Sequence, residues 1–398
     1  MTTYDWIVVG AGIVGSAMAY ELAHTGFSVL LLDTSATSPN ATRYSYGGVA
    51  YWAGDGDLSR QLCAESEAMY PLLSEELGQD IQFRELDMLL TVAPDRDPHA
   101  IAATHQGFRK PPVLLSPQEA QEMEPLLQGG AIAAAFHVRH GNVEPMALTR
   151  AYQFAFKQAG GTFAIESVQG FVREGDRIQG VTTAQHRYAA ANVLVCVGGL
   201  SRALLQAAGV AVKVYFTHAE LIETPPLDLQ LQTIVMPAEL SRMPLEAQAT
   251  QPDQQLLWDE PGHELLPPIL DAGVIQYADG VVRMGQVSRV LTDPGAPVDA
   301  IASEAQIRQA IGNLLPGFEA VPGQWAHCLV AFSGDRQPLV GALPGVEGLH
   351  ICSGFNGPFL LAPPIARHFA QFHQGQPKAV TKAVMPTLSP SRFVATPD

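Results

Sequence analysis

Residues 6–33 constrain the fold of this chain more than any other segment. A short apolar run, Trp6 to Val9, ends in the pattern Gly10-Ala11-Gly12-Ile13-Val14-Gly15, and apolar residues then recur at helical spacing. A second apolar run follows and finishes at Asp33. This order predicts a strand, a tight turn, a helix and a second, parallel strand, which together make a βαβ unit.

Each glycine of this pattern has a predicted task. Gly10 permits the turn, Gly12 lets the backbone approach a diphosphate, and Gly15 lets the helix pack closely on the strands. The unpaired N–H groups and the positive dipole end of the helix would stabilise the phosphates. Asp33 can accept hydrogen bonds from ribose hydroxyls and disfavours a 2′-phosphate. The unit therefore predicts a bound adenine dinucleotide, either NAD or FAD.

Composition excludes several other classes of protein. The 398 residues carry 39 acidic and 23 basic side chains, a net charge of −16, and 47% of them are apolar. The acidic balance without a Lys/Arg cluster argues against nucleic acid as a partner, and the apolar fraction suits packed domains. No apolar run reaches the about 18 residues of a transmembrane segment. Four scattered cysteines without a C-x-x-C pair suit a cytoplasmic location.

Further glycine-rich loops favour FAD over NAD. Residues 42–48 end in paired glycines, and helical spacing follows instead of the regular βα alternation of a nicotinamide fold. A small β-meander over 162–183 leads to a buried strand at 193–199, whose terminal glycine pair opens a helix over 200–208. Its Gly198-Gly199 pair offers another place where backbone can lie against a cofactor.

The C-terminal region repeats this arrangement. A strand over 349–353 leads into the loop 354–357, and we predict a helix from Ala362 onward with Pro363 and Pro364 in its first turn. The positive end of that helix suits the negative charge of a reduced flavin. Both ends of the chain are therefore expected to contact one FAD molecule.

These motifs together resemble the D-amino-acid oxidase family of FAD-dependent oxidoreductases, to which glycine oxidase, sarcosine oxidase and D-amino-acid dehydrogenase belong. The resemblance covers nearly the full length, in order. It rests on the N-terminal unit with Asp33, the loop Thr42–Gly48, Gly141-Asn142-Val143-Glu144-Pro145, the strand 193–199, Asp335-Arg336-Gln337-Pro338-Leu339-Val340-Gly341, and Ser353-Gly354-Phe355-Asn356-Gly357.

The resemblance implies an α/β fold with two domains. A Rossmann-like FAD-binding domain would be discontinuous and comprise residues 1–82, 143–214 and 324–398. Residues 83–142 and 215–323 would form an α+β substrate domain whose mixed sheet covers the substrate above the flavin. A polar, proline-rich stretch over 240–268 is expected to be a surface insertion or a lid.

The motifs and the resemblance also indicate a set of cofactor contacts. On this interpretation Thr42 lies near the diphosphate, Gly47 and Gly48 lie beside the isoalloxazine ring, and Val168 borders the adenine. The full set is Gly10, Gly12, Ile13, Val14, Gly15, Asp33, Thr42, Arg43, Gly47, Gly48, Val168, Val197, Gly198, Gly199, Gly354, Phe355, Asn356, Gly357 and Pro358.

Cys328 is a candidate for a covalent flavin link. It precedes Asp335 at the spacing at which sarcosine-oxidase-like members carry the cysteine bound to the flavin 8α-methyl group. A thiolate beside an oxidised flavin is a competent nucleophile for that bond. The competing interpretation is a buried, inert thiol, which is the common fate of a cysteine.

A substrate carboxylate would need a fixed cation, because an unpaired buried charge is costly. The positions at which the resemblance implies one hold Val330 and, near the C-terminal loop, Leu360. Either another arginine serves or the substrate carries no carboxylate. The alternatives weighed are Arg43, Arg283, Arg289 and Arg336.

The remaining site candidates are weaker. Tyr46, Trp52, His218 and Asn356 are pocket candidates, although each also suits a structural role. His137 and His140 lack a third ligand, so we predict no metal site and expect both on the surface. No catalytic base is assigned, because the flavin carries out the chemistry.

The sequence therefore predicts an FAD-dependent oxidoreductase that acts on a small amine or amino acid. The reaction would take a hydride from the carbon next to the nitrogen and leave an imine that water hydrolyses. Two alternatives stay open, namely a non-amine donor such as a hydroxy acid, and a flavin-binding assembly subunit without turnover. The sequence does not choose between oxygen and a quinone as the electron acceptor.

Overall fold

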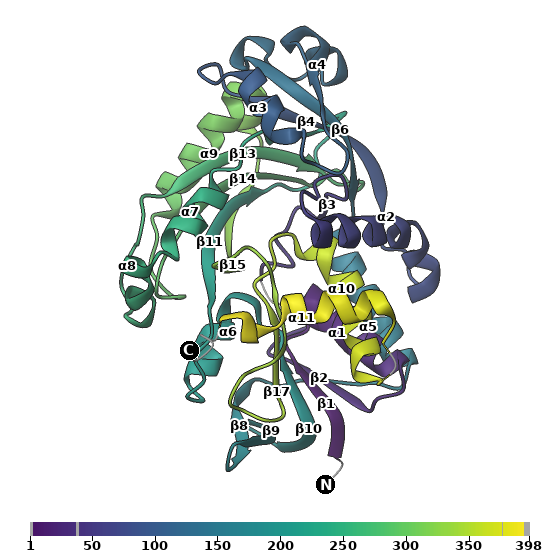
Figure 1. The fold of residues 1–398 in the computed structure, drawn as a ribbon. Coiled ribbons are helices and arrows are strands. Elements are labelled where there is room, and N and C mark those ends of the chain that lie inside the picture. The colour runs from purple at the N-terminus through teal and green to yellow at the C-terminus, as the bar shows by residue number, and fades with distance from the viewer. Residues whose placement is uncertain (1–2, 37–39, 376, 394–398) are drawn as a thin grey trace.

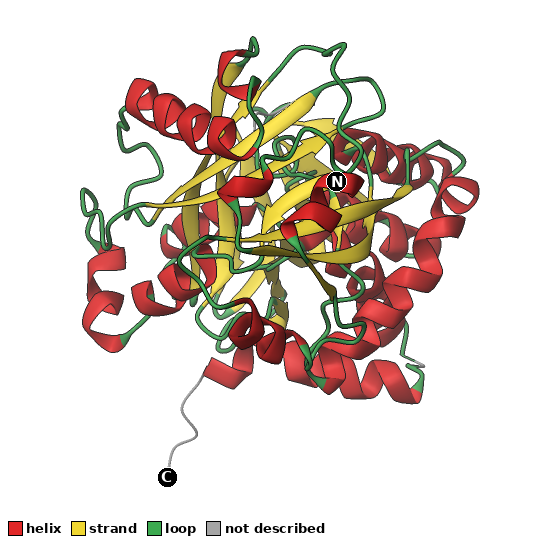
Figure 2. Ribbon diagram, turned by 90° about the horizontal axis from the view of Figure 1, so that it is seen from above, coloured by secondary structure: helices red, strands yellow, loops and turns green. Residues whose placement is uncertain are grey.

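The computed structural model describes residues 3–36, 40–375 and 377–393. Two β-sheets organise the molecule, and each lies in its own lobe (Figure 1). Seen from above, strands occupy the middle and helices surround them (Figure 2). One sheet is largely parallel and the other is mixed, which confirms the predicted α/β class with a mixed second sheet.

The first sheet has the strand order β16-β17-β10-β1-β2-β7, and β9 and β8 extend it from β10. The strands β17, β10, β1, β2 and β7 run parallel to one another. The strands are β1 (Thr3–Val9), β2 (Val29–Asp33), β7 (Thr162–Ile165), β8 (Val168–Glu174), β9 (Arg177–Thr183), β10 (Arg187–Val195), β16 (Leu339–Ala342) and β17 (Leu349–Ser353).

Both faces of this sheet are covered. Trp6 and Val8 of β1 enter one core cluster with the helices α1, α5 and α10, whereas Ile7 and Val9 enter another with β9 and α6. Because both faces of the sheet are buried, the sequences of its parallel strands are continuous apolar runs. The helical segments of this lobe are α1 (Ile13–His24), α2 (Asp57–Leu77), α5 (Pro145–Gln158), η2 (Gly198–Leu200), α6 (Ser201–Gln206), α10 (Pro358–His373), α11 (Ala379–Leu388) and η5 (Pro390–Phe393).

The second sheet has the order β15-β11-β14-β13-β12-β4-β6-β3, and β5 pairs with β6. Its strands are β3 (Gly48–Val49), β4 (Arg84–Val92), β5 (Val113–Leu115), β6 (Ala134–Asn142), β11 (Val214–Glu223), β12 (Ile234–Pro237), β13 (Ile269–Gln276), β14 (Val282–Arg289) and β15 (Gln324–Ser333). The helical segments of this lobe are α3 (Pro98–His105), α4 (Pro117–Met123), η1 (Gly129–Ala131), α7 (Arg242–Ala249), α8 (Pro252–Gln255), η3 (Leu256–Asp259), α9 (Ala300–Leu314) and η4 (Phe318–Ala320).

The mixed sheet has two chemically distinct faces. On the outer face, Ile222 of β11 packs in one apolar cluster with Ile307 and Ile311 of α9. On the inner face, Arg283 of β14 and Tyr277 donate hydrogen bonds to the carbonyl of Ser45, in the loop 42–48. The inner face of the sheet therefore looks toward the glycine-rich loops of the parallel sheet.

The mixed sheet also includes segments that were predicted to lie in the FAD-binding domain. The strand β15 pairs with β11 along its whole length, so residues 324–333 belong to the mixed sheet. Gly48 and Val49 also join the mixed sheet, because they pair with Asn142 and Gly141. The loop that was expected beside the flavin is thus hydrogen-bonded to both lobes.

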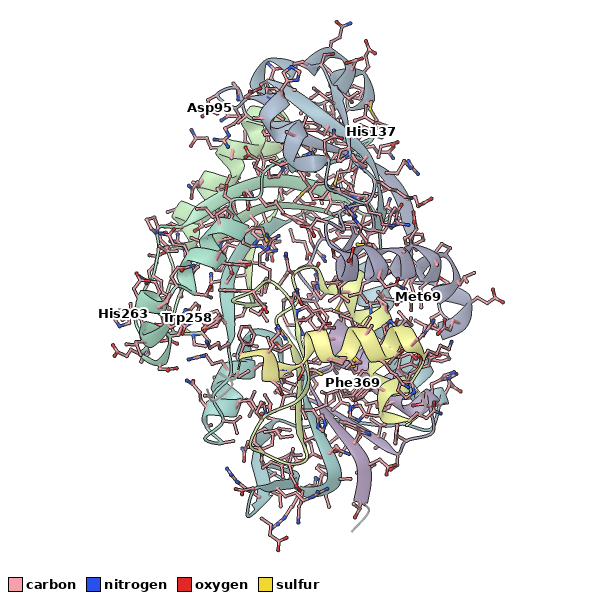
Figure 3. All side chains as sticks on the ribbon, in the orientation of Figure 1. Met69, Asp95, His137, Trp258, His263 and Phe369 are labelled. Carbon is pink, nitrogen blue, oxygen red and sulfur yellow. The ribbon has the colours of Figure 1, made fainter. Side chains whose placement is uncertain are left out.

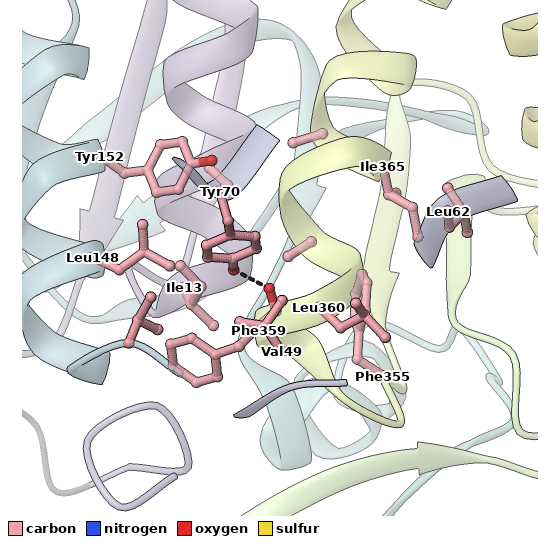
Figure 4. Close-up of a cluster of buried hydrophobic side chains, with 14 of the residues drawn as sticks. Ile13, Val49, Leu62, Tyr70, Leu148, Tyr152, Phe355, Phe359, Leu360 and Ile365 are labelled. Atoms are coloured by element: carbon pink, nitrogen blue, oxygen red, sulfur yellow. Dashed lines mark hydrogen bonds between the residues drawn. The ribbon is translucent and has the colours of Figure 1, made fainter. Parts of the chain in front are cut away.

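The C-terminal helix starts earlier than predicted. It begins at Pro358, so Pro363 and Pro364 lie inside α10 instead of in its first turn. A proline lacks the N–H that would bond to the carbonyl four residues before it. Here the Tyr70 hydroxyl of α2 donates to the carbonyl of Phe359 (Figure 4), and the Ser66 hydroxyl of the same helix donates to the carbonyl of Leu360. The neighbouring helix therefore replaces the donors that the prolines remove.

Residues 240–268 are more than a surface insertion. Leu245 and Ala249 of α7 and Trp258 of η3 are buried and pack with Tyr215 and Phe332 of the mixed sheet. Figure 3 shows Trp258 at the side of this sheet, in the same segment as His263. The predicted helix over 200–208 is also shorter in the structure, because α6 ends at Gln206.

Candidate functional site

Three glycine-rich loops follow neighbouring parallel strands. Val9 of β1 is in register with Val195 of β10, and Val195 is in register with Ile351 of β17. The segments that follow these residues therefore leave the sheet at one edge, its carboxyl edge, where ligands bind in open parallel sheets. The topology brings the N-terminal, middle and C-terminal loops together.

The first loop is packed so tightly that it requires glycine. An added Cβ atom at Gly15 would lie 1.8 Å from the carbonyl oxygen of Gly10, and one at Gly10 would lie 2.6 Å from the carbonyl oxygen of Cys196. Gly10 also has a φ of 99°, in the left-handed region. The backbone of this turn can therefore lie close to a ligand without an intervening side chain.

Side chains hold part of the backbone at the start of α1. The N–H of Ala11 donates to Asp33 Oδ2 at 2.6 Å, and the N–H of Ile13 donates to Thr42 Oγ1 at 3.1 Å. The N–H groups of Val14 and Gly15 have no protein acceptor among the described residues, and α1 has no side-chain cap. Free N–H groups at a helix N-terminus suit a diphosphate.

The second contact region surrounds Asn142. Its side-chain N–H donates to the carbonyl of Tyr46 at 2.7 Å, while its Oδ1 atom is buried without a hydrogen-bond partner. The Tyr46 hydroxyl is also buried and unpaired. Buried polar atoms are nearly always paired, so two unpaired atoms beside one loop suit a position where a ligand binds. Gly47, with a φ of 68°, completes this polar turn.

The middle and C-terminal loops leave open space beside their backbones. Added Cβ atoms at Gly198 and Gly357 would meet nothing within 4 Å, although both residues have positive φ values of 56° and 104°. Ser353 Oγ donates to the carbonyl of Gly198 at 3.2 Å and so ties the two loops together. Gly357 is the N-cap of α10 and provides no side-chain cap.

These observations fit an FAD molecule. Free N–H groups at α1 would hold its diphosphate, the carboxylate of Asp33 would lie near its ribose, and Val168 follows β7, whose last residue pairs with Asp33. The uncapped first turn of α10 would lie near the flavin ring, together with Gly198 and Tyr46. The predicted contacts Val197, Gly199, Gly354, Phe355, Asn356 and Pro358 belong to the same loops.

Arg43 has a different partner from the one expected. Its guanidinium forms two hydrogen bonds of 2.6 Å with Glu223, and Arg283 donates to the same carboxylate at 2.8 Å. These contacts lower the pKa of Glu223 against the opposing effect of its burial, and so keep it ionised. Arg43 therefore joins the loop 42–48 to the mixed sheet.

Of the pocket candidates, Trp52 is structural. Its indole N–H donates to Nδ1 of His140 at 3.0 Å. His140 is only 5% exposed, which contradicts the expected surface position, and burial lowers its pKa to about 3. Because Nδ1 accepts a hydrogen bond, the neutral ring carries its proton on Nε2, beside Gly48. His137 is half-buried against Asp87 in the upper lobe (Figure 3).

His218 does not face the loop 42–48. Neighbouring residues of a strand point to opposite faces, and Thr217 and Ala219 share the inner face with Glu223. His218 lies on the outer face, where it stacks on His327 at 4.5 Å and neighbours Glu220, the partner of Arg289. The proposed role of His218 above the flavin is therefore not supported.

Cys328 lies on the inner face, directly opposite Ala219 in the sheet. Its thiol is buried, and this burial raises its pKa to about 12. At neutral pH such a thiol is protonated and is a poor nucleophile. The position thus suits a residue near the flavin, but the protonation state disfavours covalent attachment.

We therefore expect the FAD to be bound without a covalent link. Acid precipitation of the purified protein should release all yellow colour into the supernatant, and Cys328→Ala should keep the FAD content of the unchanged protein. Flavin that stays in the washed precipitate of the unchanged protein, but not of Cys328→Ala, would show that the thioether forms after all.

Each arginine that was a candidate to bind a substrate carboxylate has a defined position in the structure. Arg43 and Arg283 bind Glu223, and Arg289 lies on the outer face with Glu220 and Glu264. Arg336 is exposed in the turn after β15. Val330 sits opposite Thr217 on the inner face, and Leu360 lies in the first turn of α10.

Sequence reasoning missed several residues at this site. Asn142 belongs to the motif Gly141–Pro145, but the motif itself does not indicate that the Asn142 amide is buried at the site. Tyr70 and Ser66 were missed as well, although two adjacent prolines in a helical pattern signal two carbonyls that need outside donors.

The described residues show no site for a metal and no membrane-spanning helix. No group of three or more His, Cys, Asp or Glu side chains within them is arranged to hold a metal ion. No helix in the ranges 3–36, 40–375 and 377–393 has both the length and the apolar character needed to cross a bilayer.

Comparison with known proteins agrees with this geometry. A family model described as FAD dependent oxidoreductase, of the DAO family, matches residues 5–372. Glycine oxidase from Pseudomonas aeruginosa is 24% identical over 95% of this chain and 96% of its own length. Hydrogen cyanide synthase subunit HcnC from the same organism is 28% identical over 52% of this chain and 58% of its own length.

Solved structures share the fold. Glycine oxidase from Geobacillus kaustophilus superposes with a TM-score of 0.79 at 19% identity and covers 99% of this chain and 100% of its own. L-proline dehydrogenase from P. horikoshii gives a TM-score of 0.76 at 19% identity over 98% of each chain. A parallel sheet with three converging glycine-rich loops, under a mixed sheet, defines a dinucleotide-binding oxidoreductase fold. This chain belongs to the DAO family of FAD-dependent oxidoreductases.

Proposed function

We propose that this protein oxidises a small amine or amino acid by taking a hydride from the carbon next to the nitrogen. Several relatives bear names that fit this chemistry, among them glycine oxidase and dimethylglycine dehydrogenase. When bound, the FAD would accept the hydride. The imine product would then be hydrolysed by water to a carbonyl compound and ammonia or a smaller amine.

The observation that carries this proposal is the chemistry of the inner face above the loops. Ala219, Leu221 and Cys328 give this face a small, apolar surface next to the Arg283–Glu223 pair. Neither His218 nor His327 projects from it, because both lie on the outer face. The carboxylates on this side, Glu223 and Glu246, are already engaged by Arg283 and by Thr217. An alcohol must lose its hydroxyl proton to a base before or during hydride loss, whereas a neutral amine supplies its own electron pair.

The residues of the chain would mainly position the substrate and exclude water. The apolar surface around Ala219 and Leu221 would place the reacting C–H above the cofactor and favour the neutral form of the amine over the ammonium ion. The hydrogen bonds of Ser45 with Tyr277 and Arg283 fix the loop 42–48 against this surface. Positioning of this kind needs no dedicated proton-transfer residue.

An anaerobic donor panel tests the proposal. The FAD-loaded protein is mixed without oxygen with matched donors that differ only in the reacting group, such as alanine and lactate or glycine and glycolate. We expect at least one amine or amino acid to bleach the flavin and its hydroxy analogue to leave it oxidised. Bleaching by hydroxy acids alone would support the alternative donor class. A flavin that no donor reduces would support the assembly-subunit alternative.

A further inference from the structure

One arginine of the inner face lacks a hydrogen-bond acceptor. Among the arginines that the structure describes, the guanidinium groups of Arg187, Arg242 and Arg336 donate no hydrogen bond to the protein. Arg187 and Arg336 are exposed, so water satisfies them. The Arg242 side chain is only 18% exposed, and its nearest partner, Glu246 Oε1, lies 3.8 Å from its Nε atom. That distance is too long for a hydrogen bond.

The backbone at Arg242 is fixed in place. The N–H groups of Ser241 and Arg242, at the start of α7, donate to the carboxylate of Asp271 at 2.7 and 3.1 Å. Asp271 is 6% exposed and belongs to β13 of the mixed sheet. The first turn of α7 is therefore anchored to the sheet, and the guanidinium that it carries has a defined location.

A short chain of contacts places that guanidinium on the inner face. Glu246 accepts a hydrogen bond of 2.7 Å from Thr217 Oγ1 through the same Oε1 atom that Arg242 approaches. Thr217 lies directly opposite Val330, and both share the inner face with Cys328. Arg242 thus brings a positive charge from α7 to the part of the sheet where the strands themselves carry none.

The resident carboxylate of Glu246 compensates this charge only in part, because it lies within ion-pair distance but accepts no hydrogen bond from the guanidinium. Glu246 is only 4% exposed, and its Oε1 atom already accepts a hydrogen bond from Thr217. A guanidinium offers five N–H donors in a planar fork that matches a carboxylate. Arg43 and Arg283 differ from Arg242, because their guanidinium groups already donate hydrogen bonds to Glu223. The Arg242 guanidinium is mostly buried and donates no hydrogen bond to the protein. It lies beside the proposed reaction space and is suited to bind an incoming anion.

We propose that Arg242 binds the carboxylate of the substrate, so that the electron donor is an amino acid rather than a plain amine. This inference rests on the proposed function and names its substrate class. The carboxylate would form two hydrogen bonds with the guanidinium in place of the loose contact to Glu246. A cation on α7 would make residues 240–268 part of the substrate site.

The test measures carboxylate binding without turnover. FAD-loaded protein is titrated with acetate, propionate and benzoate, and binding is followed by the change in the flavin absorbance spectrum. The matched neutral probes are acetamide, propionamide and benzamide. We expect at least one carboxylate to bind and its amide to bind far more weakly. Arg242→Met should weaken that carboxylate roughly 100-fold without changing amide binding, and Arg242→Lys should recover part of the loss. Arg187→Met, an exposed arginine on β10 of the other sheet, is the matched control and should change nothing.

A second variant keeps the test decisive if Arg242→Met does not fold. Glu246→Gln removes the competing negative charge, so it should tighten carboxylate binding several-fold and leave amide binding unchanged. The assignment would be overturned if Arg242→Met bound the carboxylate as tightly as the unchanged protein does. If only Glu246→Gln can be purified, unchanged carboxylate affinity in that variant would overturn it. It would also be overturned if the unchanged protein bound no carboxylate at all. Binding is measured from the spectrum of the oxidised flavin and so does not require turnover. If carboxylates bind through Arg242 but no amine reduces the flavin, the proposed reaction is refuted and the carboxylate site is not.

Discussion

Gly15→Ala is expected to abolish nearly all FAD binding. The new Cβ atom would lie 1.8 Å from the carbonyl oxygen of Gly10, which is backbone and cannot rotate away. The helix α1 would have to move out from the sheet, and its free N–H groups would leave the position that suits the diphosphate. We expect the purified variant to be colourless, as measured by flavin absorbance per chain.

The control for this variant is Gly26→Ala, at the other end of the same βαβ unit. Gly26 has a φ of 98°, and an added Cβ atom there would meet nothing within 4 Å. The left-handed backbone should cost stability of about 1–2 kcal/mol while FAD stays bound. If Gly15→Ala retained one FAD per chain, or if both variants lost FAD equally, the role of Gly15 at the diphosphate would be refuted.

Tyr70→Phe is expected to lower the free energy of unfolding by about 1–3 kcal/mol. The Tyr70 hydroxyl is the outside donor to the carbonyl of Phe359, which Pro363 deprives of its donor within α10 (Figure 4). Removing the hydroxyl leaves a buried carbonyl unpaired in the turn that is expected near the flavin ring. Denaturant unfolding of the FAD-loaded protein measures the loss.

A second substitution separates this cause from lost packing. In Pro363→Ala the new N–H of residue 363 can bond to the carbonyl of Phe359, so Tyr70→Phe should cost much less in that background. The double-mutant cycle should therefore give a coupling free energy between positions 70 and 363 of about 1 kcal/mol or more. Equal costs in the two backgrounds would show that the hydroxyl does not replace the missing helical donor.

The parts of the fold that depend on local backbone rules were predictable. The turn at Gly10, the close packing at Gly15 and the strand that ends at Asp33 follow from rules that act over a few residues. The β-meander over 162–183 is also present, as β7, β8 and β9. Such features need no knowledge of distant contacts.

The features that were missed depend on distant partners. The prediction placed the start of α10 at Ala362, with the prolines in its first turn, because the donors Tyr70 and Ser66 lie some three hundred residues earlier in the chain. Whether His218 or Thr217 faces the flavin loop depends on strand register and on where α9 packs. Arg242 became a candidate only when Thr217, Glu246 and Asp271 were seen around it.

The most direct test of the central claim is an anaerobic titration of the FAD-loaded protein with the amino acid that reduces it fastest. If both ends of the chain hold one FAD and an amine carbon supplies the hydride, one equivalent of amino acid should bleach one FAD per chain. One equivalent of the corresponding oxo acid, together with ammonia or the released amine, should appear. A protein purified without flavin, or one bleached only by donors that lack an amine nitrogen, would contradict this account.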